Sequence, residues 1–122
     1  MPTYRILLVE DIYFNQILME SLLADWGYNV ANAHNGAEGL EAIEKENFDL
    51  IILDLMMPVM DGYDFLKKKK EKNNSSLVLI VSARHDMESI ERALSFGAND
   101  YITKPFNSID LENKIKSLLN SK

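Results

Sequence analysis

The segment FDLIILDLMMPVMDG, residues 48–62, contains the pattern that decides the fold. Its four consecutive apolar residues, 50–53, are typical of a β-strand that is buried on both faces of a parallel sheet. A carboxylate, Asp54, follows at the point where this strand would leave the core. An ionisable side chain in that position raises the question of which chemistry it serves.

The rest of the chain alternates short apolar runs with amphipathic stretches. We expect strands at 4–9, 28–33, 49–54, 77–83 and 100–103. We expect helices at 13–25 and 35–47, from Asp61-Gly62 onward, from Met87 to Gly97, and after Pro105. Regular alternation of strands and helices predicts an α/β fold, a doubly wound (βα)5 arrangement in which helices cover both faces of a five-stranded parallel sheet.

The apolar positions within the helices predict the faces that pack against this sheet. In the first helix, Phe14, Leu18 and Leu22 recur at i, i+4 and i+8. The corresponding positions in the later helices are Ala37, Leu40 and Ile43, then Met87, Ile90 and Leu94, and finally Leu111, Ile115 and Leu118.

The composition indicates one globular domain, which we expect to span residues 1–122. A formal net charge of -6 argues against direct nucleic-acid binding, since phosphate backbones select basic surfaces. We interpret the lysine-rich region from Lys67 to Lys72 as a solvated helix face. The chain has no cysteine and no apolar run near the ~18 residues of a membrane span, so we expect a soluble, cytoplasmic protein.

Polar side chains follow four of the predicted strands. In open α/β sheets, ligands bind outside the carboxyl ends of the strands. Glu10 and Asp11 follow the first strand, and Asp54 follows the third. Ser82 and Lys104 lie at the ends of the fourth and fifth. We therefore expect these side chains to share one edge of the sheet.

Three acids close together would repel one another, and a hard cation would relieve that repulsion. Mg²⁺ takes about six oxygen ligands, usually one or two carboxylates and several waters. Glu10, Asp11 and Asp54 are the candidate ligands, together with a backbone carbonyl just after Asp54, for which we choose Met56. We expect Mn²⁺ to be able to substitute.

Such a site suits phosphoryl transfer. Lys104 would contribute a compact positive charge and Ser82 a hydroxyl donor to phosphoryl oxygens. With no cysteine in the chain, Asp54 is the candidate nucleophile, and it would form an aspartyl phosphate. Taken singly, Glu10-Asp11 could be helix caps and Asp54 a turn residue; their joint position favours the functional interpretation.

Four motifs resemble the receiver domain of two-component response regulators: LLVED at 7–11, DLMMPVMDG at 54–62, VSA at 81–83 and YITKPF at 101–106. The resemblance implies a flavodoxin-like fold with strand order 2-1-3-4-5. It implies that Asp54 accepts a phosphoryl group from a phosphohistidine on a histidine kinase or phosphotransfer protein. Glu10 and Asp11 match the acidic metal pair, and Lys104 matches the phosphate-pairing lysine, whose bond to Pro105 is often cis.

The resemblance also implies a switch. Ser82 matches the hydroxyl residue that turns toward the phosphoryl group, and Tyr101 matches the aromatic residue that swings inward with it. We expect phosphorylation to alter a face formed by the fourth helix, the strand 100–103 and the last helix, which would bind a downstream protein. We expect a monomer or weak dimer that catalyses its own phosphorylation and slow dephosphorylation.

Some residues depart from the family pattern, and other functions remain as alternatives. Ile12, Lys69 and Leu77 stand where many relatives have a polar residue, an apolar residue and a proline. A haloacid-dehalogenase-like phosphatase would need a second aspartate where Met56 stands. A flavodoxin-like carrier would need a phosphate loop where EDIYFN, 10–15, offers two carboxylates. A receiver used purely for binding is a further alternative. So is a receiver excised from a hybrid histidine kinase, because Asn15 resembles the receivers of such kinases.

Overall fold

A computed structural model describes residues 3–57 and 59–121. The extreme ends of the expected domain 1–122 and Pro58 of the quoted segment lie outside the described residues. The strands are β1 (Arg5–Val9), β2 (Asn29–Ala33), β3 (Leu50–Leu53), β4 (Leu77–Ser82) and β5 (Asp100–Thr103). The helices are α1 (Tyr13–Asp25), α2 (Gly36–Lys45), α3 (Gly62–Glu71), α4 (Met87–Ser95) and α5 (Ser108–Asn120).

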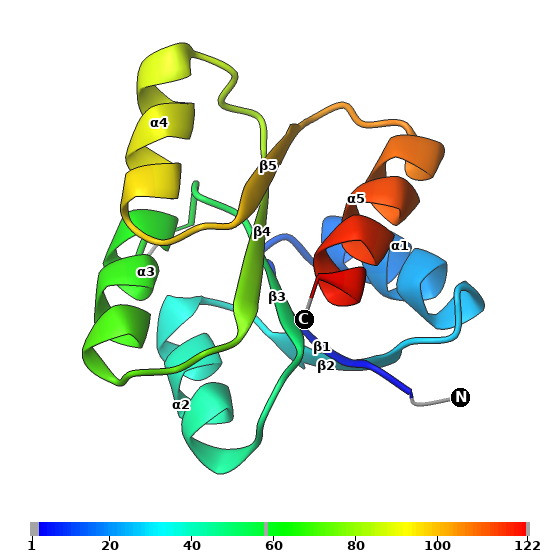
Figure 1. Ribbon diagram of the computed structural model, residues 1–122, viewed down its shortest axis with the longest axis horizontal. Coiled ribbons are helices and arrows are strands. Elements are labelled where there is room, and N and C mark those ends of the chain that lie inside the picture. Colours follow the sequence, from blue (N-terminus) through cyan, green and yellow to red (C-terminus); the bar gives the residue numbers. More distant parts are fainter. Residues whose placement is uncertain (1–2, 58, 122) are drawn as a thin grey trace.

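The strands form one parallel sheet in the order β2-β1-β3-β4-β5, which confirms the predicted fold and strand order. Helices α2, α3 and α4 cover one face of this sheet and α1 and α5 the other (Figure 1). Within the described residues, no helix is long and apolar enough to cross a membrane.

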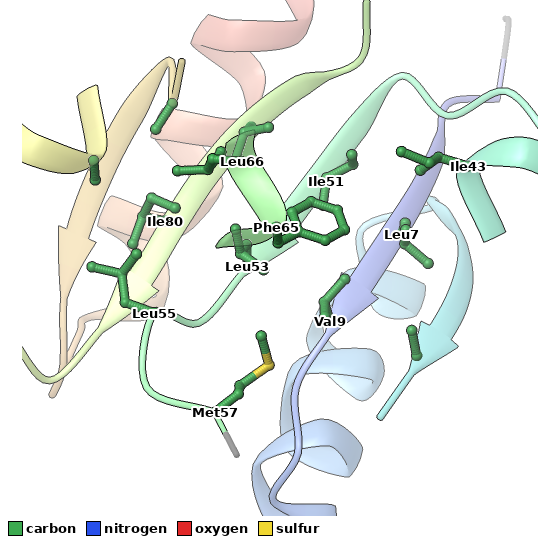
Figure 2. Packing of buried hydrophobic residues seen from close by; sticks show 14 of the residues in the cluster. Leu7, Val9, Ile43, Ile51, Leu53, Leu55, Met57, Phe65, Leu66 and Ile80 are labelled. Atoms are coloured by element: carbon green, nitrogen blue, oxygen red, sulfur yellow. The ribbon is translucent and has the colours of Figure 1, made fainter. Parts of the chain in front are cut away.

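The central strands supply two separate cores because successive side chains point to opposite faces. Beneath α2–α4 lie Leu7, Val9, Ile51, Leu53, Val78 and Ile80. Beneath α1 and α5 lie Ile6, Leu8, Leu50, Ile52, Leu79 and Val81. Figure 2 shows the first core, in which the ring of Phe65 from α3 lies over the sheet beside Ile51 and Leu53. Burial on both faces explains the continuous apolar runs.

Four of the helices begin at side-chain caps. Asn35, Asp61, Asp86 and Asn107 each accept hydrogen bonds from backbone N–H groups of the first turn. These bonds satisfy donors that have no partner within the helix. Helix α1 follows Ile12 with no side-chain cap. The two acids before Ile12 instead belong to the candidate site.

Of the apolar series Phe14, Leu18 and Leu22 in α1, only Leu22 packs against the core, where it is partly buried. Phe14 and Leu18 are exposed, whereas Gln16, Met19 and Leu23 are buried. The reason is that α1 carries apolar residues on several sides, so more than one helical face matches the pattern. Helix α4 differs in the same way: Met87 and Leu94 are exposed, and Ser89 and Ala93 are buried.

Candidate functional site

The register of β1 against β3 places the acids of the site side by side. Val9 pairs with Leu53, so Glu10 and Asp54 leave the sheet on neighbouring strands. The backbone N–H of Asp54 donates to the Val9 carbonyl at 3.4 Å, and that of Glu10 to the Ala33 carbonyl at 3.1 Å. Asp54 is 8% exposed, a high degree of burial for a carboxylate. The fold therefore holds two acids at the centre of the edge where the strands end.

Glu10, Asp11 and Asp54 form one cluster. One carboxylate oxygen from each lies within 4.8 Å of the others. The Oδ1 atom of Asp11 is buried without a hydrogen-bond partner among the described residues. Oδ1 of Asp54 accepts a hydrogen bond from the backbone N–H of Met56 at 3.0 Å, which fixes the orientation of that carboxylate. A buried, unpaired acceptor among converging acids is an arrangement that suits a cation.

Lys104 links this cluster to β5. Its ammonium nitrogen lies 3.2 Å from Oε1 of Glu10 and 3.2 Å from Oδ2 of Asp54. Burial alone would lower the Lys104 pKa, but the carboxylates of Asp54 and Glu10 outweigh burial and the pKa is raised. Burial also raises the pKa of Glu10, which Lys104 only partly counteracts. Lys104 is therefore held as a cation in contact with both acids.

The backbone holds Lys104 in this position. Its N–H donates to the Ser82 carbonyl at 2.8 Å, which extends the pairing of β4 with β5 by one residue. The bond between Lys104 and Pro105 is cis, as the resemblance implies.

Ser82 and Tyr101 meet at Arg84 rather than at Asp54. The completely buried Ser82 hydroxyl accepts a hydrogen bond from the Arg84 N–H at 3.2 Å. The Tyr101 hydroxyl donates to the Arg84 carbonyl at 2.6 Å, and the ring is buried. Burial raises the pKa of Tyr101, which keeps its hydroxyl protonated as a donor. The backbone of Arg84 thus connects the two residues that the sequence pointed to as a switch.

A pocket of about 260 Å³ opens beside the acids on the α1 side of the sheet. It is lined by Asn15 and Leu18 of α1, by Ile52 and Asp54, and by Phe106 of the β5–α5 loop, among others. This pocket was not expected from the sequence, in which Leu18 belongs to the apolar series of the helix. The excess of apolar residues in α1, more than one helical face can bury, is the feature of the sequence that could have indicated it.

The structure brings together four of the predicted site residues, Glu10, Asp11, Asp54 and Lys104. Met56 adjoins them through its backbone. Neither Ser82 nor Tyr101 forms a hydrogen bond with these acids in the structure. Both instead bond to the backbone of Arg84 in the β4–α4 loop. The bridge from Lys104 to Glu10 was not expected from the sequence.

Comparison with known proteins gives a consistent result. The family model described as the response regulator receiver domain matches residues 6–116. The chain is 36% identical over 113 residues to the uncharacterized transcriptional regulatory protein YcbL of Bacillus subtilis, covering 93% of this chain and 50% of that protein. It is 38% identical over 114 residues to the transcriptional regulatory protein ZraR of Escherichia coli, covering 93% of this chain and 26% of ZraR. The chain thus spans half or less of the length of these relatives.

Solved structures agree. The receiver domain of the sensor histidine kinase PA1611 from Pseudomonas aeruginosa, which has a magnesium ion coordinated in its active site cleft, matches with a TM-score of 0.90 and 29% identity. That match covers 98% of this chain and 99% of the other. A CheY-like receiver domain protein from Methanospirillum hungatei matches with a TM-score of 0.92 and 33% identity, covering 98% and 96%.

Proposed function

Because the chain belongs to the family of response regulator receiver domains of two-component signalling, we propose that Asp54 accepts a phosphoryl group from a phosphohistidine on a partner protein. The observation that carries this proposal is the convergence of Glu10, Asp11 and Lys104 on the buried Asp54. We also propose that residues 1–122 form a single receiver domain.

The donor set fits a magnesium ion. Glu10, Asp11 and Asp54 offer carboxylate oxygens within reach of one another, and the orphaned Oδ1 of Asp11 lacks any other partner among the described residues. These acids would hold the ion together with the backbone carbonyl of Met56, and Mn²⁺ would be able to substitute. When bound, the ion would neutralise charge on the phosphoryl oxygens during transfer.

The chain's own residues perform the remaining steps. One carboxylate oxygen of Asp54 attacks phosphorus and forms an O–P bond, while the N–P bond to the donor histidine breaks and the electron pair stays on the ring nitrogen. Lys104 already contacts Asp54 at 3.2 Å, so it is placed to pair with a phosphoryl oxygen. Slow hydrolysis of the resulting acyl phosphate by water at the same site would end the signal.

We propose that Ser82 and Tyr101 transmit phosphorylation to the face formed by α4, β5 and α5. The added charge would draw the Ser82 hydroxyl away from the Arg84 N–H and toward the phosphoryl group. Because Tyr101 is bonded to the Arg84 carbonyl, the two movements share one segment of backbone. The exposed Met87, Leu94 and Ile109 on this face support a downstream protein as its partner.

The phosphodonor is proposed to be a histidine kinase or a histidine phosphotransfer protein that docks beside α1. Tyr13, Phe14, Ile17 and Leu18 are exposed on this helix. Of these four, Leu18 also lines the pocket next to Asp54. Exposed apolar side chains on the helix beside the reacting carboxylate suit a protein donor, which can bury them.

The test is incubation with Mg²⁺ and phosphoramidate, followed by the mass of the intact protein. We expect a gain of one phosphoryl group that is absent in Asp54→Asn and retained in Asp64→Asn, a control at an exposed carboxylate in the first turn of α3. Omitting the metal ion should abolish the gain. A folded wild-type protein that gains no mass would favour a domain used purely for binding.

The switch needs a separate test. Ser82→Ala should still be phosphorylated at Asp54 but should lose the phosphorylation-dependent change in the α4–β5–α5 face. Chemical shifts of Met87, Leu94 and Ile109, compared with and without phosphoramidate, report on that face. A change in the variant as large as that in the wild type would refute the coupling.

A further inference from the structure

A second pocket lies at the opposite edge of the sheet from Asp54, where the helices return to the strands. Its volume is about 360 Å³. It is bounded by the C-terminal half of α3, by the turn between α3 and β4, and by the end of α4. Leu66 and Phe96 provide apolar wall, and Asn73 and Ser75 provide polar atoms. The proposed phosphorylation assigns no role to this pocket.

Lys69 lies against this pocket and differs from its neighbours. It is 9% exposed, whereas Lys67, Lys68 and Lys70 on the same helix are exposed. Its Nζ atom donates a hydrogen bond to the Asn74 carbonyl at 2.9 Å. Within residues 3–57 and 59–121, no carboxylate lies close enough to form an ion pair with it.

This environment disfavours the charged ammonium form of Lys69. An ammonium group has three donors, and the structure provides Lys69 with one acceptor and no countercharge. Burial lowers the Lys69 pKa accordingly. In its neutral form a lysine amine has a free electron pair and is a nucleophile.

We propose that Lys69 is a site of acylation, and that the pocket admits small acyl phosphates as the acyl donors. The neutral Nζ attacks the carbonyl carbon and forms a C–N bond. The bond between that carbon and the phosphate oxygen breaks, and inorganic phosphate leaves with the electron pair and takes up the proton lost by the amine. No metal ion, oxidant or further reactant is required.

The product also fits the site. An amide nitrogen retains one N–H, which could keep the hydrogen bond that Lys69 donates to the Asn74 carbonyl. The acyl group would occupy the pocket beside Leu66 and Phe96, which are the apolar wall. An amide cannot be protonated as an amine can, so acylation rules out a charge at a buried position that has no countercharge among the described residues, and the product should be at least as stable as the unmodified chain.

The experiment is incubation of the full chain with acetyl phosphate in the absence of divalent cations, followed by peptide mapping after cleavage at glutamate. We expect Lys69 to be acetylated faster than Lys67, Lys68 or Lys70, because burial without a countercharge raises the neutral fraction of its amine. Mapping the wild-type chain requires no variant to fold. Equal rates at the four lysines, or an unmodified Lys69, would overturn the proposal.

Matched variants sharpen the result. Lys69→Arg should remove the fastest phase of mass gain, whereas Lys70→Arg should leave it unchanged. Phosphoramidate has no acyl group and should give no modification of Lys69. Asp54→Asn should be acetylated at Lys69 at the wild-type rate, so this inference and the proposed phosphorylation can fail independently.

Discussion

The orientation of α1 can be tested with two substitutions of the same kind on the same helix. Leu23 is 0% exposed and packs in the core beneath α1 and α5, while Leu18 is 52% exposed. Leu23→Ala removes a fully buried side chain and leaves a cavity, so we expect the free energy of unfolding to fall by about 3 kcal/mol. Leu18→Ala loses only about half of its burial and leaves no enclosed cavity, so we expect a loss of about 1 kcal/mol or less.

Urea unfolding followed by far-UV circular dichroism measures both variants against the wild type. The slope of the free energy against urea should be unchanged, because neither substitution alters the surface exposed on unfolding by much. The helical pattern read from the sequence makes the opposite prediction, since it places Leu18 in the core. Equal losses, or a larger loss at Leu18, would refute the orientation of α1 described here.

Three further predictions concern the loop after β3, a helix cap and the buried lysine. Gly62→Ala would place a Cβ atom 2.8 Å from the Leu55 Cα and 3.0 Å from the Asp54 carbonyl oxygen. Denaturant titration should show a loss of about 1–3 kcal/mol, and phosphoramidate should label Asp54 more slowly. At Gly36 the three atoms nearest to an added Cβ belong to the Met60 side chain, so Gly36→Ala should cost less stability and leave the labelling rate unchanged. Hydrogen bonds from Ser89 hold the pKa of Asp86 at about 2, below its usual 3.8. The stability that Asp86 provides is therefore present above pH 3.8 and lost as the pH falls through about 2. In thermal melts, the difference in stability between the wild type and Asp86→Ala should vanish over that pH window. Burial lowers the Lys69 pKa below 10.5, so just below that pH the unfolded chain holds more protons than the folded one and stability rises with pH. Lys69→Met should be more stable than the wild type near pH 7, and this advantage should shrink as the pH approaches 10.5. A difference in stability that stays constant with pH would count against the lowered Lys69 pKa.

The sequence was sufficient for the fold because the signal is strong in the central strands. The runs in β3 and β4 are apolar without interruption, and they are buried on both faces as predicted. Helix faces were harder to predict. In α1 the exposed Phe14 and Leu18 form as regular a pattern as the buried Met19 and Leu23, and only packing distinguishes them.

For the site, topology contributed more than any single residue. The end of a parallel strand is predictable from sequence, so the positions of Glu10, Asp54 and Lys104 along the edge followed from the strand assignments. The contacts among them did not. The same sequence pattern is compatible with Lys104 directed at Asp54 alone, whereas the structure has it bridging Asp54 and Glu10. The joint bonding of Ser82 and Tyr101 to Arg84 depends on the path of the β4–α4 loop, for which the sequence has no pattern.

The charges of the site argue for a divalent cation independently of any family resemblance. The three acids carry three formal negative charges and Lys104 carries one positive charge. The two negative charges that remain are the number that one magnesium ion would balance. Burial raises the Glu10 pKa even though Lys104 lies 3.2 Å from it, and the nearby charge of Asp54 acts in the same direction as burial. Structural ion pairs normally match acids with bases, and a buried excess of acid costs stability. Such an excess of acid at the ends of the central strands, which the described residues do not balance with their own cations, supports the proposal that a divalent cation binds there.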